Sequence, residues 1–177
     1  MNDSTDLPPP EIDFSSFDFT NLTNSFLSGA TRRQSNGEKY LVFFLDEEIY
    51  AVASEQVVEV APSLHAARLP NTPEWLVGVA NLRNELISVV SLRSLLGKQN
   101  LDSPPKSKFV VLRSPNSASN VAFTVDKLSE IVALPNEKIQ FIAGDKSFFA
   151  KAMHKSNILH LIDTEKLFSS LCQNRLR

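Results

Sequence analysis

The stretch Pro73-Glu74-Trp75-Leu76-Val77-Gly78-Val79-Ala80-Asn81-Leu82-Arg83-Asn84-Glu85-Leu86-Ile87-Ser88-Val89-Val90 holds the only tryptophan of the chain and one of its five glycines. Residues 86–90 predict a β-strand that is apolar on both faces and therefore mostly buried. Residues 81–83 predict the incoming strand, and Asn84-Glu85 predicts a two-residue turn because Asn tolerates positive φ. Arg83 is then expected at the tip of a hairpin, where its guanidinium can face a partner or a nearby carboxylate.

Length and composition favour an ordinary soluble domain. The chain has 177 residues, of which 42% are hydrophobic, so it suffices for one domain or one domain plus a tail. A net charge of −2 argues against a nucleic-acid binder, which normally carries a basic face. The single cysteine excludes an internal disulfide and a multi-cysteine metal site. Without a signal peptide or an apolar run of about 20 residues, we expect a cytoplasmic protein that does not insert into a membrane.

Residues 1–37 predict a disordered, acidic tail that precedes a folded domain over residues 38–177. The segment up to Ala30 has five acidic and no basic residues, and Pro8 to Pro10 favour an extended backbone. It also carries a cluster of large apolar residues, among them Phe14, Phe17 and Phe19. Two interpretations stay open: these side chains pack loosely on the protein's own domain, or they are the anchors of a peptide motif that binds another protein.

The folded part contains an internal repeat. Predicted hairpins occupy residues 40–52 and 108–125, and residues 51–60 align with residues 122–131 without a gap, which places Glu59 on Glu130. Residues 86–91 align with residues 158–163, and Arg83 falls on Lys155, at the tip of a second hairpin closed by Ser156-Asn157. A match this long predicts two copies of one β-rich unit, over about residues 38–97 and 107–172, joined by a linker at 98–106.

Each half is expected to hold about five short strands and one short helix. The first helix, residues 91–96, should stop at Gly97, and Asp163 or Thr164 can cap the second, Glu165 to Leu171. So few strands bury a core best by curling into a small barrel. The predicted fold is therefore all-β, with two small five-stranded β-barrel subdomains side by side. Whether the halves exchange strands is left open.

The residues that could support catalysis do not form a known pattern. His154 and His160 are six positions apart, which is not a known ligand spacing, and Gly78 stands alone rather than in a phosphate-binding loop. The repeated acidic residues Glu59 and Glu130, like Glu55 and Asp126, are expected to end or flank strands. We therefore predict no enzyme, no metal and no cofactor.

Several separate stretches resemble the CheW-like domain, the coupling module of bacterial chemosensory arrays. They are residues 40–45, 57–60, 69–83, 86–93, 125–128 and 158–167, all in the expected order. The resemblance spans about Glu38 to Cys172 and implies a non-catalytic adaptor with two five-stranded barrels. It implies that the protein couples methyl-accepting chemoreceptors to a CheA-type histidine kinase, in chemotaxis, phototaxis or twitching motility.

The implied partners are the regulatory domain of the kinase, the cytoplasmic tip of the receptor, and other CheW-like proteins. The implied place is the cytoplasm, with recruitment to membrane-associated receptor arrays. The alternative from another class is a competitor with the same fold, which would bind the kinase and hold a second target through its N-terminal tail.

The resemblance also suggests site residues. Arg83 and Glu59 match a functionally important basic and acidic pair, while Val57, Phe109 and Val110 match the region that meets the receptor. For Val57 and Val110, a place in the core is an equally good interpretation. Gly78 and Asn84 complete the predicted partner-binding set. Three positions depart from the family: Asn84 and Asp46 stand where Gly is usual, and Ser91 stands where Asp is usual.

Overall fold

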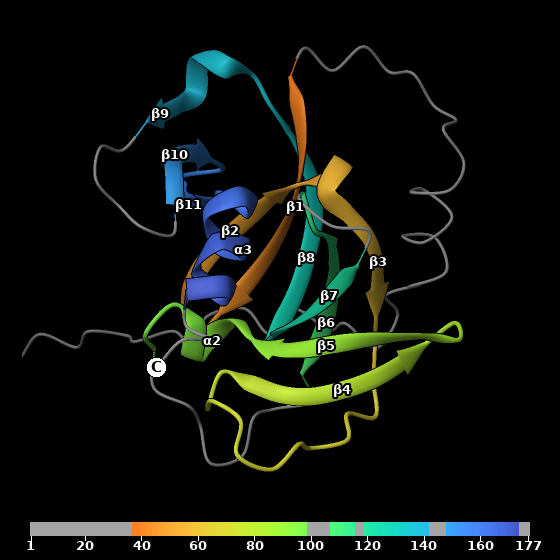
Figure 1. Cartoon of the computed structure of the whole chain (residues 1–177). Helices are drawn as coiled ribbons and strands as arrows, with labels where there is room; N and C mark the ends of the chain where they lie inside the picture. Colours follow the sequence, from red (N-terminus) through yellow and green to blue (C-terminus); the bar gives the residue numbers. More distant parts are fainter. Residues whose placement is uncertain (1–36, 99–106, 116–118, 142–147, 174–177) are drawn as a thin grey trace, which may run out of the picture. The chain divides into compact units, whose positions relative to one another are not determined.

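The computed structural model describes residues 37–98, 107–115, 119–141 and 148–173 (Figure 1). The predicted tail up to residue 36, with Phe14, Phe17 and Phe19, and nearly all of the predicted linker lie outside the described residues. Among the helices in the described part of the chain, none is long and apolar enough to cross a membrane.

The described chain is mainly β, as predicted. The first half contains β1 (Glu38–Leu45), β2 (Glu48–Ala53), β3 (Val57–Ala61), β4 (Leu76–Leu82), β5 (Glu85–Ser91) and the short helix α2 (Leu92–Leu95). The second half contains β6 (Lys108–Arg113), β7 (Asn120–Val125), β8 (Lys127–Leu134), β9 (Ile139–Phe141), β10 (Phe148–His154), β11 (Asn157–Ile162) and helix α3 (Thr164–Gln173). Short 3-10 turns, Ser54–Gln56 and Asn136–Lys138, precede β3 and β9.

The two halves of the sequence exchange strands reciprocally. The first sheet has the order β8-β1-β2-β11-β10-β9, and the second has the order β3-β6-β7-β5-β4. Each sheet thus combines the first hairpin of one half (β1–β2 or β6–β7) with the later strands of the other half. The parallel pairings β2–β11 and β5–β7 join the two contributions. The repeat is therefore real, but neither half forms a sheet on its own, and the first sheet has six strands rather than five.

Each sheet encloses its own core. One cluster of buried residues draws on β1, β2, β8, β10 and β11, with Ile139 of β9 packed against it. A second cluster draws on all five strands of the second sheet. Because residues from every strand meet in one cluster, each sheet has to curl around its core. This is the arrangement that the small number of short strands predicted.

The strands β1 and β6, which are equivalent in the repeat, are buried on both faces. Val42 of β1 faces the core of its own sheet, while Leu41 and Phe43 on the opposite face are 0% and 2% exposed. β1 also contacts β7 of the other sheet, and the Phe44 carbonyl accepts a hydrogen bond from the amide of Asp126 at 3.1 Å. Burial on both faces explains why β1 and β6 are almost continuously apolar.

Both predicted turns lie one residue earlier than expected. The turn residues are Arg83–Asn84 and Lys155–Ser156, with φ values of 51° and 67°, and of 47° and 69°. Positive φ at both central residues is the geometry that matches the twist of the two strands of a hairpin. Glu85 and Asn157 therefore begin the returning strands. The shift also corrects the expectation for residue 86: Leu86 is 71% exposed, not buried.

The predicted stop at Gly97 and the predicted cap at Asp163 are confirmed, whereas Ser91, which was expected inside the first helix, precedes it. Ser91 caps α2, since its hydroxyl oxygen accepts a hydrogen bond from the amide of Ser94 at 3.2 Å, and Gly97 follows the helix with a φ of 72°. Serine is among the residues that favour this capping position, as is the aspartate that the family resemblance led us to expect there. At α3, Asp163 is the cap, with its carboxylate 3.0 Å from the amide of Lys166.

Candidate partner-binding site

Arg83 projects from the turn between β4 and β5. The amide of Asn84 donates to the side-chain oxygen of Asn81 at 3.1 Å, which fastens the turn from inside. Asn tolerates the left-handed backbone that Gly would otherwise supply, so the departure at position 84 keeps the turn geometry.

The predicted pair of Arg83 and Glu59 is present. The Nε of Arg83 lies 2.8 Å from Oε2 of Glu59, and the side chains are 68% and 17% exposed. Glu59 belongs to β3 and Arg83 follows β4, and these strands are the two ends of the second sheet. The ion pair therefore joins the two ends of a curled sheet while most of the Arg83 side chain stays exposed.

The same pair recurs in the second half. Lys155, in the turn between β10 and β11, places its Nζ 2.7 Å from Oε1 of Glu130 on β8. His154 also approaches this carboxylate, with Nε2 at 3.8 Å from Oε1. An ion pair between this hairpin and the third strand is thus a feature of the fold in both halves. What distinguishes the first half is the guanidinium, a planar group with several donors, in place of a lysine.

Exposed apolar residues accompany both hairpins. Leu86 on β5 is 71% exposed, and its counterpart in the repeat, Ile158 on β11, is 52% exposed and directly opposite Met153, at 51%. Sequence reasoning missed Leu86 because its strand was expected to be buried on both faces. The signal that could have found it is its place near the turn, where β4 and β5 extend past β7, whose pairing with β5 begins only at Ser88.

The structure places Val57, Phe109 and Val110 in the interior, at 8%, 9% and 1% exposure. Such burial leaves them little surface for a partner and favours the interpretation as core. An irregularity in the pairing of β3 with β6 lies between Val57 and Glu59, and it leaves Val58 at 37% exposure. A β-bulge of this kind re-aims side chains, so the exposed apolar residue beside Glu59 is Val58 rather than Val57.

Gly78 has a structural reason to be glycine. Its φ is 152°, and a Cβ built there would lie 2.2 Å from the carbonyl oxygen of Ala67. Ala67 pairs with Val79 through two backbone hydrogen bonds, of 2.7 and 3.0 Å. The glycine therefore allows the long connection between β3 and β4 to lie against β4. Gly78 is buried, which argues against the predicted contact with a partner. That contact stays a prediction.

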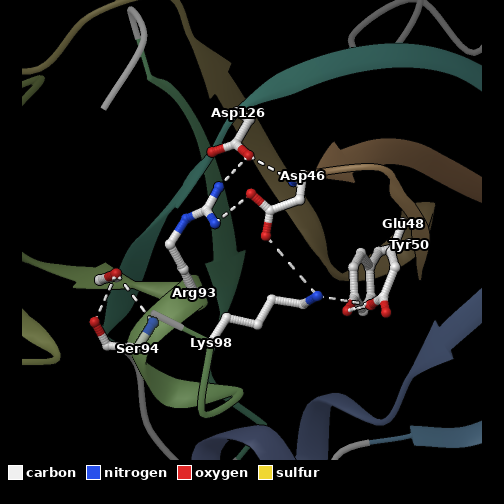
Figure 2. Close-up of polar contacts among 8 residues, drawn as sticks. Asp46, Glu48, Tyr50, Arg93, Ser94, Lys98 and Asp126 are labelled. Atoms are coloured by element: carbon white, nitrogen blue, oxygen red, sulfur yellow. Dashed lines mark hydrogen bonds and ion pairs between the residues drawn. The ribbon is translucent and has the colours of Figure 1, made fainter. Parts of the chain in front are cut away.

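A charged cluster that the sequence analysis did not find lies between the sheets (Figure 2). We name it the Arg93 cluster: Asp46, Glu48, Arg93, Lys98 and Asp126. The guanidinium of Arg93 contacts Oδ1 of Asp46 at 2.5 Å through Nη1 and Oδ2 of Asp126 through Nη2. The amide of Asp46 also donates to Oδ2 of Asp126 at 2.7 Å. Asp46 has a φ of 56°, a left-handed conformation that glycine adopts without strain and that Asp tolerates.

The cluster continues to a buried tyrosine. Lys98 places its Nζ 2.8 Å from Oε2 of Glu48, and that carboxylate also accepts a hydrogen bond from the hydroxyl of Tyr50. The hydrogen bond with Lys98, followed by that with Tyr50, holds the pKa of Glu48 below its usual value. Burial, reinforced by the bond to Glu48, raises the pKa of Tyr50. The carboxylate is thus kept charged and the phenol neutral.

Arg93 has a side chain that is only 9% exposed. Burial alone would lower its pKa, but the hydrogen bond to Asp46 and the charge of Asp126 outweigh burial and raise the pKa. The cluster was missed because its acidic members are far apart in sequence. Arg93, the one charged residue in the mainly apolar stretch 89–96, could have indicated the cluster, since a buried arginine needs carboxylate partners.

Two cavities lie beside these residues. One, of about 610 Å³, has Arg93, Asp126 and Phe109 in its lining, and the other, of about 850 Å³, has Trp75, Leu86 and Phe168. Among the residues that the structure describes, no three His, Cys, Asp or Glu side chains gather in a way that could hold a metal ion. The arrangement offers exposed charged and apolar groups at hairpin tips, which is suited to binding macromolecules.

Comparison with known proteins identifies the architecture. The profile of the family described as CheW-like domain matches residues 39–172. The chemotaxis protein CheW of Klebsiella aerogenes is 27% identical over 140 residues, which is 76% of this chain and 83% of that protein. A probable chemotaxis protein CheW of Rhizobium etli is 27% identical over 81% of this chain and 96% of its own length. The crystal structure of the scaffolding protein TtCheW from Thermoanaerobacter tengcongensis superposes with a TM-score of 0.69 at 23% identity, over 75% of this chain and 92% of that one.

Proposed function

This chain belongs to the CheW-like domain family, a family of non-catalytic adaptors, and from that membership we propose that it couples chemoreceptors to a CheA-type histidine kinase. Relatives that carry the name chemotaxis protein CheW support this proposal. The protein would act in the cytoplasm, at membrane-associated receptor arrays, through its domain from residue 38 onward. It would bind the regulatory domain of the kinase and the cytoplasmic tip of the receptor.

The observation that carries the proposal is the state of Arg83. Its side chain is 68% exposed, yet Glu59 orients the guanidinium through a contact of 2.8 Å. An arginine held in place loses less side-chain entropy on binding than a free one, and Arg is among the residues that dominate protein interfaces. Exposed Leu86, on the same hairpin, adds an apolar contact beside it. We propose Arg83, Glu59 and Asn84 as contacts with a partner, with Val58 and Leu86 as apolar neighbours.

The test is Arg83→Ala, compared with Lys155→Ala as a matched control. Both substitutions break an exposed ion pair between a hairpin turn and the third strand of the same half, so each should change the stability of the domain by less than about 1 kcal/mol. If Arg83 is a central contact, its loss should weaken binding to the kinase or the receptor about ten-fold or more, while Lys155→Ala retains more affinity.

Normal binding of both partners by folded Arg83→Ala would remove Arg83 from the site. Equal losses in the two variants would mean that the ion pairs act only through the fold. A reconstituted system of receptor, kinase and this chain also separates an adaptor from a competitor. An adaptor raises the kinase activity that responds to the receptor, whereas a competitor on the same fold lowers it.

A further inference from the structure

The Arg93 cluster connects the two sheets. Arg93 lies in α2, which directly follows β5 and contacts β7, so its backbone moves with the second sheet. Asp46 lies in the turn between β1 and β2 of the first sheet, and Asp126 lies where the chain passes from β7 to β8, from one sheet to the other. Lys98 and Glu48 add a second ion pair between the same two bodies, at 2.8 Å. Both ion pairs therefore cross from sheet to sheet.

The cluster breaks the symmetry of the repeat. The position equivalent to Arg93 is Glu165, and the position equivalent to Asp126 is Glu55. A glutamate in place of the arginine cannot bind a second carboxylate, so these equivalent positions cannot form the same arrangement in the second half. Of the ion pairs in the described residues, Arg83–Glu59 and Lys155–Glu130 stay within one sheet, whereas Arg93–Asp46 and Lys98–Glu48 cross between sheets.

We propose that Arg93 and Asp46 are positioning residues, which fix the orientation of the two sheets relative to each other and thereby set how well the domain couples its partners. The second part rests on the proposed function. Apolar packing between the sheets, such as that of Leu41 and Phe43 on the outer face of β1, is non-directional, so a single orientation of the sheets needs directional contacts as well. A planar guanidinium that binds two carboxylates at once restricts both distance and direction, which a point charge on a flexible chain does not.

The orientation of the two sheets also affects a cavity beside the Arg93 cluster. Arg93 and Asp126 also line the cavity of about 610 Å³, together with Leu45 of the first sheet and Phe109 of the second. A rotation of one sheet against the other would change the shape of this cavity and the separation of the hairpin tips at Leu86 and Ile158. A partner that contacts both sheets binds most tightly when the sheets already have the bound orientation. No part of the binding free energy is then needed to fix that orientation.

The test measures the distance between the sheets in the chain alone. Spin labels at Leu86→Cys on β5 and Ile158→Cys on β11, in a Cys172→Ser background, report one exposed position on each sheet. Arg93→Lys keeps the charge but loses the planar fork, and Asp46→Asn keeps tolerance of positive φ but loses the charge. Lys155→Gln is the control, since it breaks a pair within one sheet.

We expect a broader distance distribution in Arg93→Lys and Asp46→Asn and an unchanged one in Lys155→Gln. Unlabelled Asp46→Asn should lose receptor-coupled kinase activation about five-fold or more. An unchanged distribution in both cluster variants, with circular dichroism showing that they are folded, would overturn the proposal. If the distribution broadens but coupling is normal, the link between orientation and coupling is refuted. If the unsubstituted chain itself fails to couple, the proposed function is wrong, and the distances still decide the role of the cluster.

Discussion

Replacing Gly78 with alanine separates a structural from a partner-binding role for this residue. A Cβ at this position would lie 2.2 Å from the carbonyl oxygen of Ala67, in a backbone conformation with a φ of 152° that L-residues rarely adopt. The strained backbone costs about 1–3 kcal/mol. Relief of the clash breaks the two hydrogen bonds between Ala67 and Val79, each worth about 0.5–1.5 kcal/mol. We therefore expect Gly78→Ala to destabilise the domain by roughly 2–6 kcal/mol.

The assay is urea unfolding followed by the fluorescence of Trp75, the only tryptophan. Gly97→Ala is the matched control, because its φ of 72° is also positive but no atom lies within 4 Å of an added Cβ. That substitution should cost only about 1–2 kcal/mol. Amide hydrogen exchange at Ala67 and Val79 should accelerate in Gly78→Ala alone. If Gly78→Ala is no less stable than Gly97→Ala and these amides stay protected, the steric argument fails. Weakened partner binding in that stable variant would then favour the prediction that Gly78 contacts a partner.

Two further predictions concern burial and charge. Val110→Ala should destabilise the domain by roughly 1–3 kcal/mol in urea unfolding, because Val110 is 1% exposed; a stable variant with weakened receptor binding would contradict its place in the core. Because the pKa of Glu48 is lower in the folded state than in the unfolded chain, its contribution to stability is complete above the ordinary glutamate pKa and is lost as pH falls through the lowered value. Glu48→Gln should therefore be less stable than the unsubstituted protein at neutral pH, and its free energy of unfolding should change less as the pH is lowered. Identical urea midpoints of the two proteins at every pH would refute this.

Much of the fold was predictable from local patterns. The apolar runs predicted β1 and β6 because strands buried on both faces carry continuous hydrophobic sequence. Gly97 and Asp163 marked helix ends because capping is a local interaction of neighbouring residues. The pair of Arg83 and Glu59 followed from a family resemblance, and the contact of 2.8 Å confirms that the two side chains meet. Their contact with a partner remains a prediction.

Errors arose where the outcome depended on details of pairing. Turn residues were misplaced by one position, since asparagine suits either central position of a tight turn. Leu86 and Val58 were not identified as exposed, because the end of a sheet and a β-bulge are set by the partner strand.

The order of residues is sufficient to show that this protein is built from two copies of a β-rich unit, because a repeat can be recognised by aligning the chain with itself. How the copies combine is visible only in the folded chain, where the first hairpin of each copy pairs with the later strands of the other. The tertiary structure also assembled Asp46, Arg93 and Asp126 into one cluster across the sheets. Strand pairing between halves and contacts between distant charges depend on which surfaces meet in space, and no local pattern of residues encodes that choice.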